Sequence, residues 1–157
     1  MMEELSLHLL DIAMNSLAAG ARCIQIAVLE SQRRDRLILR VRDDGRGMDA
    51  ATLQKVLNGA TTTKASRRKK IGLGLALLRQ TCEMCDGRLR VWSRPGRGTS
   101  VTASMRLSHV DRPPLGDLTA TIEALCAASP DVDVQLRYHS DEGKFCFSSQ
   151  ELRQQKG

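Results

Sequence analysis

The sequence predicts a mixed domain of helices and strands, of the α+β class. Residues 3–19 carry apolar side chains at helical spacing, and residues 23–30 alternate apolar and polar side chains as a strand does. Residues 89–107 predict two strands joined by an Arg-Pro-Gly-Arg-Gly turn. The chain has 157 residues, which suits one domain large enough to bury its own core.

The other elements follow in chain order. A second strand is predicted at 37–42 after a polar turn, then a glycine loop at 44–47 and a short helix at 49–57. Residues 59–70 lack periodicity and consist mostly of Thr, Lys and Arg, which indicates a loop. A further helix at 71–85 ends at Asp86-Gly87.

A junction is predicted where Asp111-Arg-Pro-Pro114 interrupts the pattern. After it, residues 117–128 predict a helix, and alternating residues from Val132 to Phe147 predict a β-hairpin. We therefore expect one domain at 1–107 and an extension at 108–157 that packs on the same domain.

Charge is unevenly distributed along the chain. The net charge is +6, and residues 1–107 carry 19 basic but only 10 acidic side chains. Such a segment could meet a polyphosphate, a nucleic acid or an acidic partner. Aromatic residues make up 3% of the chain, which counts against a base-stacking surface, so a nucleic-acid partner is not expected.

The cellular location and the role of the thiols can be inferred from the apolar runs, the N-terminus and the cysteine spacing. No apolar run approaches the ~18 residues of a membrane span, and the acidic N-terminus lacks the basic start of a signal peptide. We expect a cytoplasmic protein with no membrane contact. The five cysteines are irregularly spaced, and the Cys82/Cys85 pair has no second pair to complete a metal site. We expect both thiols to be functionally silent.

The first helix carries a polar stripe, because Glu4, His8, Asp11 and Asn15 share one narrow face. One interpretation is an ordinary solvated face. The other starts from Asn15, a poor helix former whose amide oxygen suits Mg²⁺. Asp11, one turn earlier, could then hold a water or accept a proton.

Two glycine motifs complete the candidate chemistry. Asp43 ends a strand, and Gly45 and Gly47 follow it. A carboxylate so placed can accept a hydrogen bond from an amino group such as that of adenine, although an ordinary Asp-Gly turn fits equally. Gly72-Leu73-Gly74-Leu75 opens a helix after a basic loop, which indicates either phosphate binding or a tight loop-to-helix join. The Walker and dinucleotide-binding patterns are absent.

In order and spacing, these motifs resemble those of the ATPase family that includes gyrase, the chaperone Hsp90, histidine kinases and MutL. Residues 11–21 resemble its N box, and residues 42–48 resemble its first glycine box. Thr61–Lys64 followed by Gly72–Leu75 is similar to the histidine-kinase lid and second glycine box, and Gly96–Thr99 is similar to the late Gly-Thr element. The resemblance covers residues 3–107.

The resemblance implies a fold and a site. The fold is a two-layer α/β sandwich whose mixed, mainly antiparallel sheet has helices on one face. ATP and Mg²⁺ are the implied ligands: Asn15 would bind the metal, Asp43 the adenine amino group, and Thr99 would lie near the base. The other implied nucleotide contacts are Gly45, Gly47 and Met48 at the base, Lys64 from the lid, and Gly72, Leu73, Gly74 and Leu75 at the phosphates.

One departure affects the implied chemistry. Asp11 stands where hydrolytic members carry Glu, and its shorter side chain puts efficient hydrolysis in doubt but not binding. Two function classes remain: a regulatory kinase that phosphorylates a partner protein, and an anti-sigma-like or MutL-like switch that binds ATP without phosphotransfer. A nucleic-acid-associated ATPase is a weaker third. The chain shows no dimerisation helices ahead of residue 3, so we do not expect a complete sensor kinase.

Overall fold

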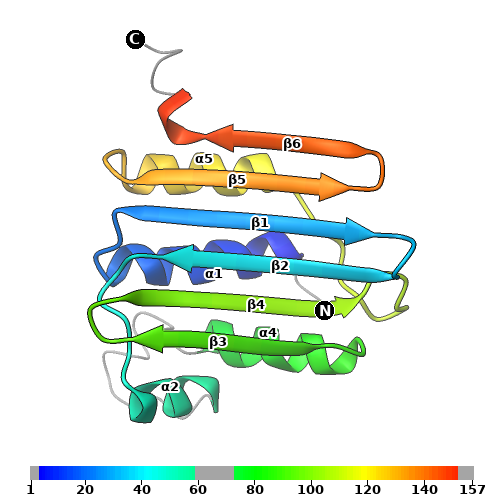
Figure 1. The fold of residues 1–157 in the computed structure, drawn as a ribbon, viewed down its shortest axis with the longest axis horizontal. Helices are drawn as coiled ribbons and strands as arrows, with labels where there is room; N and C mark the ends of the chain where they lie inside the picture. The colour runs from blue at the N-terminus through cyan, green and yellow to red at the C-terminus, as the bar shows by residue number, and fades with distance from the viewer. Residues whose placement is uncertain (1–3, 59–72, 152–157) are drawn as a thin grey trace.

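A six-stranded sheet, backed by helices, forms the framework of the molecule (Figure 1). The structure is a computed structural model that describes residues 4–58 and 73–151. The strands lie in the order β3-β4-β2-β1-β5-β6. They are β1 (Cys23–Ser31), β2 (Arg36–Asp43), β3 (Arg88–Arg94), β4 (Gly98–Arg106), β5 (Asp133–Ser140) and β6 (Gly143–Ser148).

Four helices are described: α1 (Leu5–Ala18), α2 (Ala50–Leu57), α4 (Leu73–Met84) and α5 (Leu118–Ala128). Two begin one residue later than the sequence pattern predicted, because the residue before each is an N-cap. The Asp49 side chain accepts a hydrogen bond from the Thr52 N–H at 2.7 Å, and the Asp117 side chain accepts one from the Ala120 N–H at 3.0 Å.

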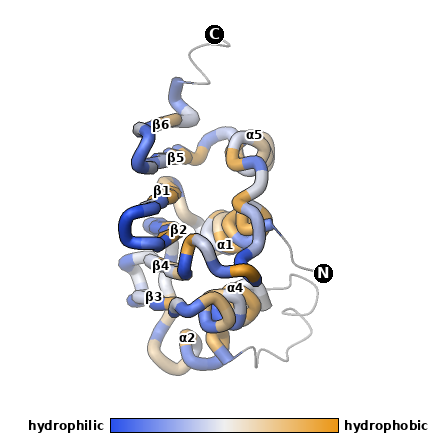
Figure 2. The backbone as a smooth tube through the Cα atoms, turned by 90° about the vertical axis from the view of Figure 1, so that its right-hand side faces the viewer, coloured by the Kyte–Doolittle hydropathy of each residue, from blue (hydrophilic) through white to orange (hydrophobic). Residues whose placement is uncertain are grey.

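Pairing within the sheet is mixed and mainly antiparallel. The β1–β5 pair is parallel, with Cys23 opposite Asp133, and the other four pairs are antiparallel. The helices α1, α4 and α5 lie on one side of the sheet (Figure 2). The predicted two-layer sandwich is therefore confirmed.

Alternation along the strands separates the two faces of the sheet. In β2, Leu37, Leu39 and Val41 are almost fully buried, whereas Ile38 and Arg40 between them are half-buried and Arg36 and Arg42 on either side are exposed. The buried positions meet the apolar faces of the helices and form one continuous core. The opposite face has no covering layer among the described residues (Figure 2).

The segment between β4 and α5 accepts hydrogen bonds from the start of α1. The backbone N–H groups of Leu5 and Ser6, which have no partners inside the helix, donate to the carbonyls of Pro114 and Leu115 at 2.9 and 2.8 Å. The extension at 108–157 thus contributes two strands to the sheet and two caps to the first helix. The division of the chain at residue 107 stays a prediction.

The first helix departs from a simple solvated stripe. Glu4 precedes the helix as its N-cap residue, and His8 is buried, while Asp11 is exposed and Asn15 is half-buried. Only the C-terminal half of the stripe is therefore open to a ligand. Within the described ranges, no helix is long and apolar enough to cross a membrane.

Candidate functional site

A cavity of about 400 Å³ opens where α1, α2 and α4 meet the ends of β2 and β4. Its walls are mainly apolar, with polar groups concentrated on α1 and at the end of β2. It is lined by Ile12, Asn15, Ser16, Ala18, Ala19, Asp43, Arg46, Gly47, Met48, Thr52, Val56, Leu75, Thr99 and Val101. Mostly apolar lining with a few convergent polar groups is typical of small-molecule sites.

Asp43 is fixed in this cavity by two hydrogen bonds. Ser16 Oγ donates to Asp43 Oδ2 at 2.6 Å, and the Gly45 N–H donates to Asp43 Oδ1 at 2.8 Å. A carboxylate oxygen has two lone pairs, so each oxygen keeps one acceptor position for a ligand. The end of β2 positions the Asp43 carboxylate in the cavity, and Ser16 on α1 fixes its orientation.

The glycine loop after Asp43 is clamped to the β3–β4 hairpin. The Gly96 N–H donates to the Arg46 carbonyl at 2.6 Å, and the Met48 N–H donates to Ser93 Oγ at 2.8 Å. Gly47 has a φ of +73°, and a Cβ there would collide with the Arg94 carbonyl. Only glycine therefore allows the two loops to approach this closely.

Thr99 also lines the cavity and lies near the start of β4, in the same hairpin. Its hydroxyl lies 2.8 Å from Ser93 Oγ, with either oxygen able to donate. Thr99 is also paired with Asp43 in the β2–β4 register, which places the two predicted contacts on adjacent strands. The structure thus brings together Asn15, Asp43, Gly47, Met48, Leu75 and Thr99 around one cavity.

Asp11 and the start of α4 lie next to each other, and neither Asp11 nor Gly74 lines the cavity. A Cβ built on Gly74 would lie 3.8 Å from Asp11 Oδ2, an ordinary van der Waals distance, so the start of α4 lies directly beside this carboxylate. Asn15, one turn along α1, lines the cavity, and its side chain makes no hydrogen bond within the described part of the chain. An amide oxygen in this position is available to a hard cation.

Some predicted residues do not line the cavity. Gly45 packs against Ala19 and Gly74 against Asp11, so both shape the site from behind. Lys64 and Gly72 lie outside the described residues, as does the predicted lid at 59–70, and for Leu73 only the backbone is described. Among residues 4–58 and 73–151, no three His, Cys, Asp or Glu side chains gather as a metal site.

Sequence reasoning missed several residues that build the cavity. Ser16 orients Asp43, Ser93 joins the two loops, and Val56 and Thr52 bring α2 into the wall. A buried serine beside Asn15 was a usable signal, because hydroxyls in helix interiors seek partners. The contribution of α2 depends on how this helix packs in three dimensions, and no sequence motif indicates it.

Comparison with known proteins adds an independent finding. The family model described as histidine kinase-, DNA gyrase B- and HSP90-like ATPase matches residues 1–109. The sensor histidine kinase YvrG of Bacillus subtilis (strain 168) is 32% identical over 91 residues, which are 56% of this chain and 16% of that protein.

A second relative is the non-motile and phage-resistance protein of Caulobacter vibrioides. It is 30% identical over 119 residues, which are 71% of this chain and 14% of that protein. The chain therefore spans about one sixth of the length of either relative, and both similarities concern one portion of a much longer protein.

Proposed function

The chain belongs to the family of histidine kinase-, DNA gyrase B- and HSP90-like ATPases, and from this premise we propose that it binds Mg-ATP in the α1–β2 cavity and uses it to regulate a partner protein. The family gives the coarser function, an ATP-binding histidine-kinase-like ATPase domain. The residues, the metal and the partner belong to the proposal.

One observation carries the nucleotide site: the doubly anchored Asp43 carboxylate in a mainly apolar cavity. We assign it the adenine amino group, because each oxygen has a free acceptor position and its two protein donors already fix it. Apolar walls from Ile12, Val56 and Val101 suit the faces of a flat ring. These contacts leave the base enclosed and the rest of the nucleotide directed towards α4.

The remaining residues fit a metal–phosphate end. We assign Mg²⁺ to the Asn15 amide oxygen, and the phosphates to the backbone N–H groups at the start of α4 near Gly74 and Leu75. Bound there, the metal would neutralise phosphate charge. This chain's own contribution would be to hold the Asn15 oxygen and the N–H groups at the start of α4 near the same cavity.

Asp11 is the group we assign to proton handling. Its carboxylate lies beside Gly74, the neighbour of the cavity-lining Leu75, and Asp11 Oδ2 would accept the proton of an attacking hydroxyl or water. In the kinase form of the proposal the hydroxyl belongs to the partner. In the alternative form, a binding switch, Asp11 only helps to order the site and ATP is turned over very slowly.

Thermal unfolding with and without Mg-ATP tests the nucleotide site. Saturating ligand at about 100 times Kd stabilises the folded state by about 2.7 kcal/mol, so the melting temperature should rise by several degrees. Asp43→Asn should remove most of that rise, because the amide presents donors towards the adenine amino group.

Asp44→Asn is the matched control for this test. The Asp44 carboxylate accepts hydrogen bonds from the N–H groups of Arg22 and Cys23 and does not line the cavity. These bonds lower its pKa, so the variant should lose some stability. Its response to Mg-ATP should nevertheless be unchanged. An undiminished response of Asp43→Asn would remove Asp43 from the site.

Phosphate release separates the two forms of the proposal. The isolated chain should turn over ATP slowly, Asp11→Glu should raise the rate, and Asp11→Asn should lower it, since general-base assistance is typically worth about 10²–10⁴-fold. Thermal shifts with ATP should be preserved in both variants. Fast turnover unaffected by Asp11→Asn would show that another group takes the proton.

A further inference from the structure

The uncovered face of the sheet is strongly basic. In β1 to β4, the side chains that alternate with the buried positions include seven arginines and no Asp or Glu. These arginines are Arg36, Arg40, Arg42, Arg88, Arg90, Arg94 and Arg106. Seven of the chain's 24 Lys and Arg side chains are thus gathered on the side opposite the helices.

Two of these arginines and Arg137 of β5 (Asp133–Ser140) form a regular row across the strands. The β3–β4 register pairs Arg90 with Thr102, the β4–β2 register pairs Thr102 with Arg40, and β1 continues the row with Ala27, which is opposite both Arg40 and Arg137. Arginine therefore lies on every second strand, and a smaller side chain lies on each strand between two arginines. We call Arg90, Arg40 and Arg137 the arginine row.

Spacing follows from this register. Neighbouring strands lie about 4.8 Å apart, so successive arginines of the row start about 10 Å from each other and the row extends about 20 Å. Thr102 and Ala27 keep the like charges from facing each other directly. Each guanidinium consequently has room for a ligand on either side.

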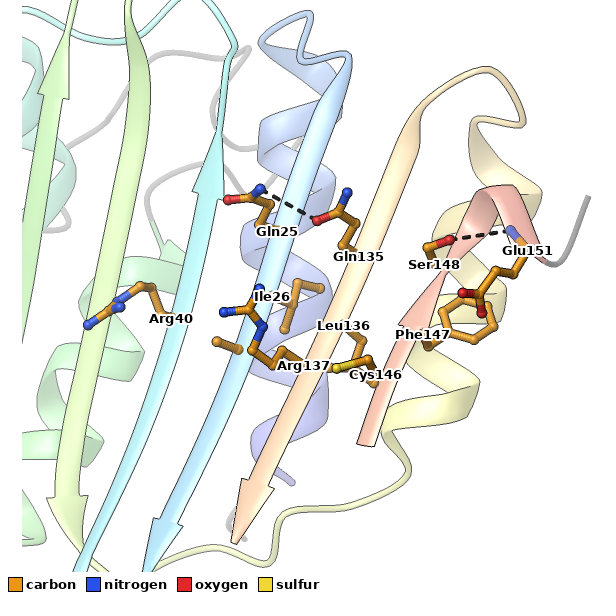
Figure 3. Close-up of a pocket in the computed structure, with 11 residues that line it drawn as sticks. Gln25, Ile26, Arg40, Gln135, Leu136, Arg137, Cys146, Phe147, Ser148 and Glu151 are labelled. Atoms are coloured by element: carbon orange, nitrogen blue, oxygen red, sulfur yellow. Dashed lines mark hydrogen bonds between the residues drawn. The ribbon is translucent and has the colours of Figure 1, made fainter. Parts of the chain in front are cut away.

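A hollow of about 220 Å³ on this face is lined by Ala27, Arg40 and Arg137, among others (Figure 3). Gln25 and Gln135 border one end, where the Gln25 amide donates to the Gln135 side-chain oxygen at 3.5 Å. Glu151 is the acidic residue at its rim. The two arginines and the two glutamines in the lining suit a hydrophilic anionic group.

The charge of the row is uncompensated. Arg106 is neutralised by Asp35 and Asp86 at 3.1 and 3.2 Å, but none of the arginine-row guanidinium groups forms an ion pair or side-chain hydrogen bond with the described residues. Guanidinium groups left free in this way attract phosphate or carboxylate. The face is therefore complementary to a polyanion.

We propose that the open sheet face binds single-stranded nucleic acid, with the phosphodiester backbone following the arginine row. Stable protein–protein interfaces have an apolar centre depleted of charge, whereas the centre of this face is arginine, threonine and glutamine. Nucleic-acid interfaces are polar and strongly positive, which matches it. This placement of charge reverses the expectation drawn from the low aromatic content.

Trp92 supplies a stacking position beside the row. It is 49% exposed on the same face, and the Arg94 guanidinium lies 5.8 Å from its ring centroid. One aromatic residue can stack one base, so phosphate contacts should dominate and sequence preference should be weak. The proposal does not depend on the ATP site, which lies on the other face of the sheet.

Intrinsic fluorescence of Trp92 tests the proposal on the full chain, because it is the single tryptophan of the protein. Unlabelled twenty-nucleotide poly-U RNA or poly-T DNA should quench it, and both should bind with similar affinity since the phosphates are shared. Affinity should fall steeply between 50 and 200 mM salt, as counterion release requires.

The decisive variant replaces Arg40, Arg90 and Arg137 by Gln. It should bind at least about tenfold more weakly, and its slope of log affinity against log salt should be shallower by about two, at roughly 0.7 per lost phosphate contact. The control variant replaces Arg33, Lys55 and Arg79 by Gln, which removes equal charge away from the row. It should keep the wild-type slope.

Three results would overturn the proposal. Equal loss in both triple variants would show only a response to net charge. Poly-glutamate of matched length binding as tightly as RNA would assign the face to acidic proteins. Duplex DNA binding more tightly than either single strand would exclude a single-strand track. Circular dichroism of the variants, expected to be wild-type, separates lost binding from lost folding.

Discussion

The two faces of the sheet differ in whether their charged side chains have partners within the protein. On the helix-covered face the functional carboxylate of Asp43 has two protein donors and apolar neighbours. On the open face the arginine row has no counter-charges among the described residues, and threonine and glutamine lie beside it. In our proposals the first arrangement would select one small ligand by geometry, and the second would attract a long ligand by charge.

A single strand builds both surfaces. In β2, Leu37, Leu39, Val41 and Asp43 point to the helices, while the alternating side chains point away from them. Because side chains along a strand alternate in direction, eight residues can specify two unrelated surfaces. Variants on the two faces should therefore differ in kind as well as size.

Thiol reactivity should show the largest difference between the two faces. Cys82 is fully buried, and burial raises its pKa to about 12, whereas Cys146 is exposed beside the open-face hollow. A thiol reagent at neutral pH should modify Cys146 at least about a thousandfold faster, because Cys82 requires both opening and deprotonation. Mass spectrometry of timed samples gives both rates; comparable rates would contradict the burial of α4 against the sheet.

Neighbouring side chains on β2 should separate the faces by stability. Leu39→Ala removes a core side chain that is 1% exposed and should lower the free energy of unfolding by about 3 kcal/mol. Ile38→Ala, its neighbour on the open face, should cost about 1 kcal/mol. Urea denaturation measures both, and similar losses would mean that the open face is covered by something in solution.

Two glycines of the site should sharpen the comparison further, with smaller effects. Gly47→Ala would press a methyl group against the Arg94 carbonyl and should cost about 2 kcal/mol, together with weaker ATP binding. Gly96→Ala has a similar positive φ but open space around it and should cost about 1 kcal/mol without affecting ATP. Neither change should alter RNA binding, which can be read from Trp92 quenching.

The sequence predicted the features that depend on residues close together in the chain, and it did not predict most features that depend on residues far apart in it. Alternation in β1 and β2 and the caps at Asp49 and Asp117 are local, so the elements and their bounds followed from neighbouring residues. The grouping of Asn15, Asp43 and Thr99 came from a resemblance in motif order, and the structure places all three around one cavity.

Other features needed the third dimension. Nothing near Ser16 in the chain reveals that it meets Asp43, 27 residues away. The arginine row joins residues from β3, β2 and β5, and only the strand order brings them into line. The sequence showed an excess of positive charge, but which side of the molecule carries it depends on register, since a shift of one residue would turn every arginine inward.

The parallel pairing of β1 with β5 has a consequence for synthesis. Asp133, the partner of Cys23, is made about 110 residues later, and the carbonyls that cap α1 come from Pro114 and Leu115. While the chain emerges from the ribosome, the β1–β2 hairpin can form early, but one side of β1 stays an unpaired edge and the first helix lacks its caps. A nascent chain at that stage exposes a strand edge that can pair with other chains. All residues that line the ATP cavity precede β5, so the site's lining is made before the strand that covers the open edge of β1.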